Sequence, residues 1–329
     1  MATQTKNVIQ TVRDTLYQVM EDDPTVIVLG EDVGRYGGVF GATMGFVDAF
    51  GTERVIDTPL AESSIVGVAI GASLNGLRPV AEIQFADFIY SAADQLISEA
   101  AMMYYRSNGE YPCPIVVRAP YGGPSGRGPY HSQSIESVFF GIPGLKIVAP
   151  STPYDVKGLL RAAVFDPDPV LFLEHKGTYR AVRGEVPDEP YEIPIGVADV
   201  KRPGRDVTAI SFGLSLHRCL EAAEALSAEG IEVEVIDLRS ILPYDRDTVL
   251  ASVEKTGKVL IVHEDNVTGG VGGELAAMIA QEAFFYLDAP IKRLGMPDIS
   301  AIPYAQSIEA PLFPSTQSIA QALRELAAF

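Results

Sequence analysis

Short runs of Val, Ile and Leu alternate with longer segments of helical periodicity over the first half of the chain. Short runs of branched apolar side chains are typical of buried strands, and apolar residues at three- and four-residue spacing are typical of helices. The alternation predicts a parallel sheet with helices on both faces. The expected strands are residues 25–32, 78–85, 114–120, 145–151 and 169–175, and the expected helices are 8–20, 88–107 and 155–166.

A polar, proline-rich passage at residues 183–206 interrupts this pattern and is typical of a domain linker. We therefore expect an α/β fold with two doubly wound sheet domains, residues 1–190 and a smaller one at 206–329, joined by a linker at 191–205. Ligands of such sheets bind beyond the carboxyl ends of the strands, so residues just after each strand are the first candidates for function. The second domain has expected strands at 207–213, 231–238 and 258–265 and expected helices at 215–230, 247–257 and 274–284.

The chain carries 43 acidic and 25 basic residues, a formal net charge of -18. Because nucleic-acid binding depends on cationic contacts, nucleic acid is not an expected partner. An acidic surface can attract a basic protein, although solubility explains many acidic proteins equally well. No apolar run reaches the ~18 residues of a membrane span, and the first residues lack a secretory signal, so no membrane association is expected. The only cysteines, Cys113 and Cys219, are far apart, which favours a reducing cytoplasm.

Glu62 is a carboxylate at the start of an almost wholly apolar segment that follows the strand-like residues 54–59. It has two interpretations. A first-turn acid interacts favourably with the helix dipole, by about 0.3–1 kcal/mol, and needs no further role. Alternatively, a carboxyl group that points into a dry cleft favours its protonated form and can donate a proton to a ligand nitrogen. The apolar segment after Glu62 predicts a helix that is buried on most sides.

His131 lies in a glycine-rich passage, residues 119–134, that follows a predicted strand. Such a loop can move and can bring a side chain close to a ligand, so the imidazole is a candidate acid, base or carboxylate contact. A solvent-exposed loop histidine is the alternative. The passage lacks the GxxxxGK[ST] pattern, which excludes a P-loop.

Phe85 and Phe88 follow another predicted strand, beside two acidic residues. Aromatic side chains at this spacing usually pack in a core. The alternative is a platform for a planar ring.

Two further sequence patterns do not match the binding motifs that they suggest. Residues 268–274 are glycine-rich but do not match GxGxxG, so they predict only a tight turn between a strand and a helix. His263, Glu264 and Asp265 lack the ligand spacing of a catalytic metal site.

Six motifs follow one another along the chain: LGEDVGRYGGVF (29–40), RVIDTPLAES (54–63), AEIQFADF (81–88), YHSQS (130–134), PGLKIVAPSTPYDVKGLL (143–160) and DPVLFLEHK (168–176). Taken together, they resemble the beta subunits of thiamine-diphosphate-dependent 2-oxo acid dehydrogenases. Within that family the chain is most similar to the branched-chain (2-oxoisovalerate) dehydrogenases, and pyruvate or acetoin dehydrogenase is the alternative. A non-catalytic flavin- or nucleotide-binding module is the alternative from another class, against which the missing GxGxxG and P-loop patterns argue.

The resemblance implies a transketolase-like fold, with a pyrimidine-binding domain followed by a smaller C-terminal domain. It also implies a cofactor shared between chains. An alpha subunit would hold the diphosphate and Mg²⁺ through a GDG motif that this sequence lacks, in a heterotetramer of two alpha and two beta chains. Glu62 matches the glutamate that hydrogen-bonds the aminopyrimidine, Phe88 matches the aromatic residue against that ring, and His131 matches a histidine that contacts substrate or assists acyl transfer.

A structural potassium ion is implied by the same resemblance, with Ile115, Ala163, Asp166 and Asp168 as its ligands. Asp168 stands where relatives often have Asn, which weakens the match at that ligand. The resemblance also implies that the acidic C-terminal domain and the chain end at Phe329 bind a basic subunit-binding domain of the lipoyl acyltransferase core.

Overall fold

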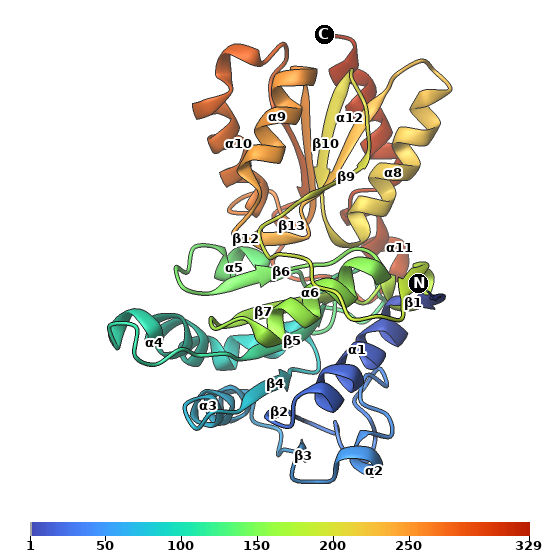
Figure 1. Ribbon diagram of the computed structural model, residues 1–329. Helices are drawn as coiled ribbons and strands as arrows, with labels where there is room; N and C mark the ends of the chain where they lie inside the picture. The colour runs from blue at the N-terminus through green and yellow to red at the C-terminus, as the bar shows by residue number, and fades with distance from the viewer. Residues whose placement is uncertain (1) are drawn as a thin grey trace. The chain divides into compact units, whose positions relative to one another are not determined.

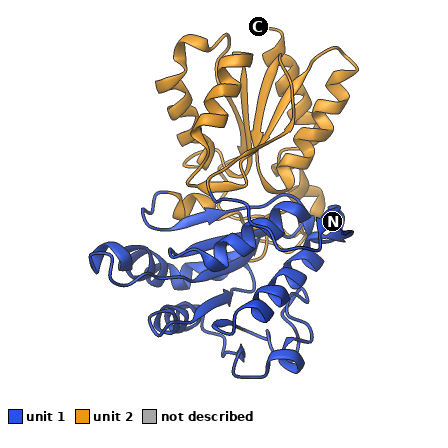
Figure 2. Cartoon of the chain, in the orientation of Figure 1, with its two compact units in different colours: residues 1–121, 141–195 blue, residues 122–140, 196–329 orange. Residues whose placement is uncertain are grey.

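The computed structural model describes residues 2–329 and divides the chain into two compact units. The first unit consists of residues 1–121 and 141–195, and the second consists of 122–140 and 196–329 (Figure 2). The passage around His131 therefore belongs to the second unit. The boundaries that we expect at residues 190 and 206 stay predictions about how the chain divides into domains.

Six parallel strands form the sheet of the first unit, in the order β6-β7-β5-β4-β2-β3 (Figure 1). Strands β2, β5 and β7 are buried along their whole length, which explains their continuous apolar character. The sheet confirms the predicted α/β class. The strands are β2 (Val26–Gly30), β3 (Val55–Asp57), β4 (Arg78–Glu82), β5 (Val116–Tyr121), β6 (Lys146–Val148) and β7 (Val170–His175).

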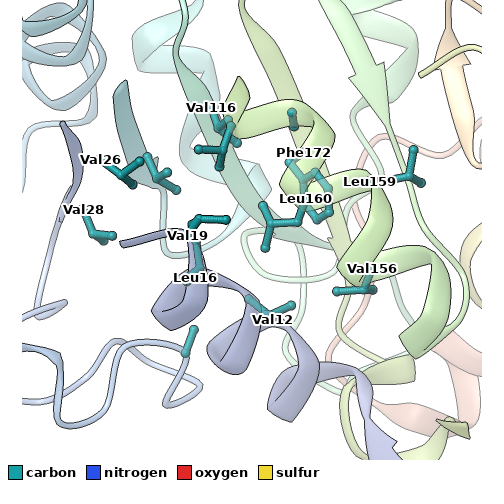
Figure 3. Close-up of a cluster of buried hydrophobic side chains, with 14 of the residues drawn as sticks. Val12, Leu16, Val19, Val26, Val28, Val116, Val156, Leu159, Leu160 and Phe172 are labelled. Carbon is teal, nitrogen blue, oxygen red and sulfur yellow. The ribbon is translucent and has the colours of Figure 1, made fainter. Parts of the chain in front are cut away.

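Helix α1 (Val8–Asp22) covers one face of this sheet. The Asn7 side chain accepts a hydrogen bond from Gln10 N, and the Gln10 side chain accepts one from Asn7 N, which closes a capping box at the helix start. Val12, Leu16 and Val19 turn toward the buried side chains of the strands and of α6 (Figure 3). The other helical elements of this unit are α2 (Phe46–Phe50), α3 (Glu62–Ser73), η1 (Ala86–Ala92), η2 (Gln95–Ala100), α4 (Ala101–Arg106), α6 (Pro153–Phe165) and α7 (Thr178–Ala181).

The helix predicted at residues 88–107 is not continuous. It consists of a 3₁₀ segment, η1, then a π-helical segment, η2, and only then the α-helix α4. Ala92, Leu96 and Ala100, which are four residues apart, are buried along this segment.

The predicted linker region contains two strands that the sequence did not indicate. β8 (Arg183–Pro187) pairs antiparallel with β1 (Thr3–Asn7) in the first unit, and β9 (Asp199–Arg202) pairs antiparallel with β11 (Val233–Asp237) in the second. Both are polar edge segments held by backbone hydrogen bonds, so they lack the apolar pattern on which the prediction depended.

The second unit has a five-stranded sheet in the order β14-β13-β10-β11-β9, parallel except for β9. Helices α8 and α12 bury Leu216, Leu226 and Leu323 in the core of this unit. Its other strands are β10 (Val207–Ser211), β12 (Ser240–Leu242), β13 (Val259–Asn266) and β14 (Lys292–Met296). Its helical elements are α5 (Glu136–Phe140), α8 (Gly213–Ser227), α9 (Arg246–Thr256), α10 (Val271–Glu282), η3 (Phe284–Tyr286), α11 (Gln306–Glu309), η4 (Ala310–Leu312) and α12 (Thr316–Ala327). Over residues 2–329, no helix combines the length and the apolar character that crossing a membrane requires.

Candidate active site

The order of strands in the first unit marks a position for a ligand. β2 lies between β3 and β4, and the chain leaves β2 toward β3 but leaves β4 toward β5, on the opposite side. In such sheets a crevice opens beyond the carboxyl ends of the two strands whose connections diverge. The residues that follow β2 and β4, namely Glu31 and residues 83–88, therefore lie at the expected position of a site.

Glu62 is the first residue of α3, the helix that connects β3 to β4. The preceding residue, Ala61, has no side chain to cap the helix, and Glu62 is the only acid in the first turn. Its side chain is partly exposed, and its Oε2 accepts a hydrogen bond of 3.2 Å from the Ser91 hydroxyl. That hydroxyl also lies 3.0 Å from the backbone oxygen of Phe88. Ser91 thus connects two of the predicted site residues, Glu62 and Phe88.

The apolar face of α3 is less covered than we predicted. Ile65, Val66 and Ile70 are buried, but Val68 is 57% exposed and Leu74, just after the helix, is 45% exposed. The prediction of a helix buried on most sides is wrong for the single chain. One side of α3 is therefore exposed in the single chain.

Glu31 is a second carboxylate at this site, and our sequence interpretation did not single it out. It follows β2 directly and is 9% exposed. Burial raises the pKa of its carboxyl group, and the charges of Glu62 and Asp32 raise it further. The only signal in the sequence is an acidic pair directly after a buried strand. The acidic pair indicates a site only when the strand order is known, because that order places the end of β2 at the expected crevice.

Phe88 and Phe85 have different surroundings, although they are three residues apart. Phe85 is 6% exposed, and its ring contacts those of Phe40 and Phe88 edge to face, with centroids 5.6 and 6.1 Å away. Phe88 keeps part of its surface accessible. The core interpretation therefore fits Phe85, while Phe88 remains available to contact a ring.

A buried ionic network joins three strands next to these residues. Arg118 of β5 donates two hydrogen bonds to Glu174 of β7, at 2.6 and 2.9 Å, and one to Glu82 of β4, at 2.7 Å. Tyr179 donates a further bond of 2.6 Å to Glu174. Burial raises the pKa of Glu82, while the Arg118 charge opposes that shift. A Cβ atom on Gly38 would lie 2.6 Å from Glu82 Oε1, so the network also requires a glycine at that position.

His131 lies in the second unit, whereas Glu62, Glu31 and Phe88 gather in the first. Its imidazole is partly exposed, and its backbone N–H donates to the oxygen of Gly128 at 3.3 Å. Its role at the site stays a prediction.

Two of the four predicted potassium ligands, Asp166 and Asp168, contact a lysine. Lys146 Nζ lies 2.7 and 2.8 Å from the two carboxyl oxygens of Asp166 and 3.1 Å from Asp168 Oδ2. The backbone oxygens of Ile115 and Ala163 accept hydrogen bonds from Val170 and Asp166. Within residues 2–329, no group of three or more His, Cys, Asp or Glu side chains is arranged to hold a metal ion.

Comparison with known proteins agrees with this architecture. A model of the transketolase pyrimidine-binding domain matches residues 4–182, and a model of the transketolase C-terminal domain matches residues 196–319. A solved structure described as a split-gene transketolase, an inactive beta4 tetramer, superimposes with a TM-score of 0.79 over 98% of both chains. At 23% identity it supports the fold alone.

Relatives of higher identity cover nearly the whole chain. The 2-oxoisovalerate dehydrogenase subunit beta of Bacillus subtilis (strain 168) is 56% identical over 98% of both sequences, and the pyruvate dehydrogenase E1 component subunit beta of the same strain is 45% identical over 98% of both. The acetoin:2,6-dichlorophenolindophenol oxidoreductase subunit beta of Cupriavidus necator is 43% identical over 95% of both. With its two transketolase domains and these relatives, the chain belongs to the family of 2-oxo acid dehydrogenase beta subunits.

Proposed function

We propose that this chain is the beta subunit of a branched-chain 2-oxo acid dehydrogenase, which oxidatively decarboxylates 3-methyl-2-oxobutanoate and related 2-oxo acids and passes the acyl group to a lipoyl domain. The observation that carries the proposal is the position of Glu62, which Ser91 connects to Phe88 near the carboxyl ends of β2 and β4, where the strand order predicts a crevice. The branched-chain substrate is favoured because identity to the 2-oxoisovalerate relative is 56%, against 45% for the pyruvate relative.

The residues around Glu62 fit the aminopyrimidine half of thiamine diphosphate. When bound, this cofactor supplies a carbon nucleophile and an electron sink for loss of carbon dioxide. Glu62 presents a partly exposed carboxyl group that can hold a proton against a ring nitrogen, and Phe88 presents a partly exposed ring. Glu31 takes up a proton more readily than an ordinary glutamate because it is buried beside Glu62. The raised pKa of Glu31 favours its protonated form, so Glu31 can share a proton with the neighbouring Glu62.

The other half of the site would come from an alpha subunit, in a heterotetramer of two alpha and two beta chains. This sequence has no GDG motif, so the diphosphate and its Mg²⁺ would be held by the partner. The open apolar side of α3, with Val68 and Leu74, supports a partner chain that covers this helix.

A potassium ion also fits the charge of its predicted site. Asp166 and Asp168 carry two negative charges against the single positive charge of Lys146, so one monovalent cation would neutralise the group. Each carbonyl oxygen has a second lone pair, so Ile115 and Ala163 can coordinate a cation in addition to their backbone hydrogen bonds.

The further partner in this proposal is the lipoyl acyltransferase core. We assign the whole complex to the cytoplasm. His131 would contact the substrate or assist acyl transfer. The net charge of -18 and the exposed terminal Phe329 support binding of a basic subunit-binding domain.

The deciding experiment reconstitutes the chain with its alpha partner, thiamine diphosphate and Mg²⁺. We expect decarboxylation by the complex and none by the lone chain. Turnover by the lone chain would contradict the shared site. The same complex, given 3-methyl-2-oxobutanoate and pyruvate in parallel, should prefer the branched substrate; a preference for pyruvate would establish the alternative.

A further inference from the structure

Glu309 is a fully buried carboxylate that the site described above does not use. It is the last residue of the short helix α11. Its Oε1 accepts a hydrogen bond of 3.0 Å from the backbone N–H of Ser125, and its Oε2 accepts one of 2.7 Å from Gly126. Both of its oxygens therefore bind the passage that carries His131, more than 180 residues earlier in the sequence.

The same loop, residues 122–133, makes other close contacts within the second unit. Gly123 N donates to Glu264 Oε2 at 3.1 Å. A Cβ atom on Gly123 would lie 2.5 Å from the ring of Phe313, and one on Gly128 would lie 2.5 Å from the ring of Tyr304. The glycines of this loop thus permit its backbone to approach residues 304–313 closely. Loop and segment fit each other along several residues.

Hydrogen bonds within the loop connect the Glu309 contact to the neighbour of His131. Ser125, whose N–H binds Glu309, has its hydroxyl 2.8 Å from the hydroxyl of Ser132, the neighbour of His131. The loop is closed at its base by a hydrogen bond of 2.9 Å from Gly122 N to the oxygen of Gln133. A displacement at Ser125 therefore acts directly on Ser132, the residue next to His131.

We propose that Glu309 is a positioning residue, which holds the loop at Ser125 and Gly126 so that His131 is presented for acyl transfer. A carboxylate suits this role because both of its oxygens accept and neither donates. A glutamine in its place directs an N–H₂ group at one of the two backbone N–H donors. The inference rests on the proposed role of His131, but the placement of the loop can be measured separately.

Three variants of the beta chain test the proposal in the reconstituted complex: Glu309→Gln, Glu309→Asp and, as a control, Glu224→Gln on the exposed side of α8. The first readout is hydrogen exchange of the amides of residues 123–128. The second is acylation of a lipoyl domain, compared with decarboxylation measured with an artificial electron acceptor. We expect Glu309→Gln to speed exchange at least tenfold and to slow lipoyl acylation at least tenfold, with a smaller loss with the artificial acceptor. Glu309→Asp should restore part of both, and Glu224→Gln should change neither.

Unchanged exchange in Glu309→Gln would overturn the positioning role, whatever His131 does. If that variant fails to assemble, Glu309→Asp decides in the same way, because its shorter side chain weakens the two hydrogen bonds without removing the charge. His131→Ala tests the proposed function separately: normal lipoyl acylation in that variant would refute the role of His131, and the exchange result for Glu309 would still stand.

Discussion

The Ser91 hydroxyl lies 3.2 Å from Oε2 of Glu62 and so holds one oxygen of that carboxyl group. Ser91 belongs to η1, the segment that follows β4, whereas Glu62 begins the helix that precedes β4. Within residues 2–329 only Oε2 accepts a hydrogen bond, so in the proposed function Oε1 is the oxygen that would bind the pyrimidine. The single hydroxyl proton is shared between Glu62 and the backbone oxygen of Phe88.

Glu62→Gln should nearly abolish decarboxylation by the reconstituted complex. The amide cannot hold and release a proton, and loss of a general acid or base typically costs about 10²–10⁴ in rate. Ser91→Ala removes only one neutral hydrogen bond, so a loss of about two- to tenfold is expected. Both variants should assemble normally by size-exclusion chromatography. Wild-type turnover in Glu62→Gln would refute the proton role.

Arg118→Met should strongly destabilise the first unit. The substitution leaves Glu82 and Glu174 buried without their cationic partner, which typically costs about 3–5 kcal/mol. The matched control is Arg106→Met, which breaks the exposed ion pair with Glu99 and should cost less than about 1 kcal/mol. Urea unfolding of both variants measures the difference. Equal losses would show that the buried network contributes no more than a surface pair.

Glu136→Gln should make stability less sensitive to pH. Glu136 is fully buried in α5, neither carboxyl oxygen has a hydrogen-bond partner within residues 2–329, and burial together with the charge of Asp265 raises its pKa well above its usual value. A raised pKa means that the folded state holds the proton more tightly. Its contribution to stability is complete below the pKa of the unfolded chain and is lost as the pH rises through the pKa of the folded state.

The variant should therefore gain stability relative to the wild type as the pH rises from about 5 to 8, by at most about 1.4 kcal/mol per pH unit. Urea midpoints at the two ends of this range provide the measurement. Glu224→Gln, an exposed acid, should leave the wild-type slope intact. His263 titrates in both proteins and cancels in the comparison. A constant difference between Glu136→Gln and the wild type across the range would contradict the assignment.

The α/β class was predictable from the sequence because buried parallel strands are continuous apolar runs, and β2, β5 and β7 have that pattern. The edge strands β1, β8 and β9 were not predictable from the sequence. Backbone hydrogen bonds hold them in place, and their polar side chains show no apolar pattern. Helix α12 could have been predicted, because Ile319, Leu323 and Leu326 recur at helical spacing after a serine N-cap.

The candidate site was predictable only in part. Glu62 and Phe88 stand in motifs that resemble a family, but the part played by Glu31 depends on which strand lies beside which. No local sequence pattern marks Arg118 as part of an ionic network, because its partners Glu82 and Glu174 are 36 and 56 residues away. Contacts of that range follow from the sheet order and not from any local pattern.

Potassium should raise the thermal stability of the complex through the group around Lys146. The two carboxylates of Asp166 and Asp168 exceed the one ammonium by a single charge, so a bound monovalent cation relieves their repulsion. A ligand at 100 times its dissociation constant stabilises the folded state by about 2.7 kcal/mol, an effect visible as a higher unfolding midpoint in KCl than in tetramethylammonium chloride at equal ionic strength. Asp166→Asn retains a ligand oxygen but makes the group neutral, so it should remove most of the difference between the salts. Asp48→Asn, in α2, is the control and should preserve that difference. Equal midpoints of the wild type in the two salts would mean that Lys146 alone balances this group and that no potassium ion binds there.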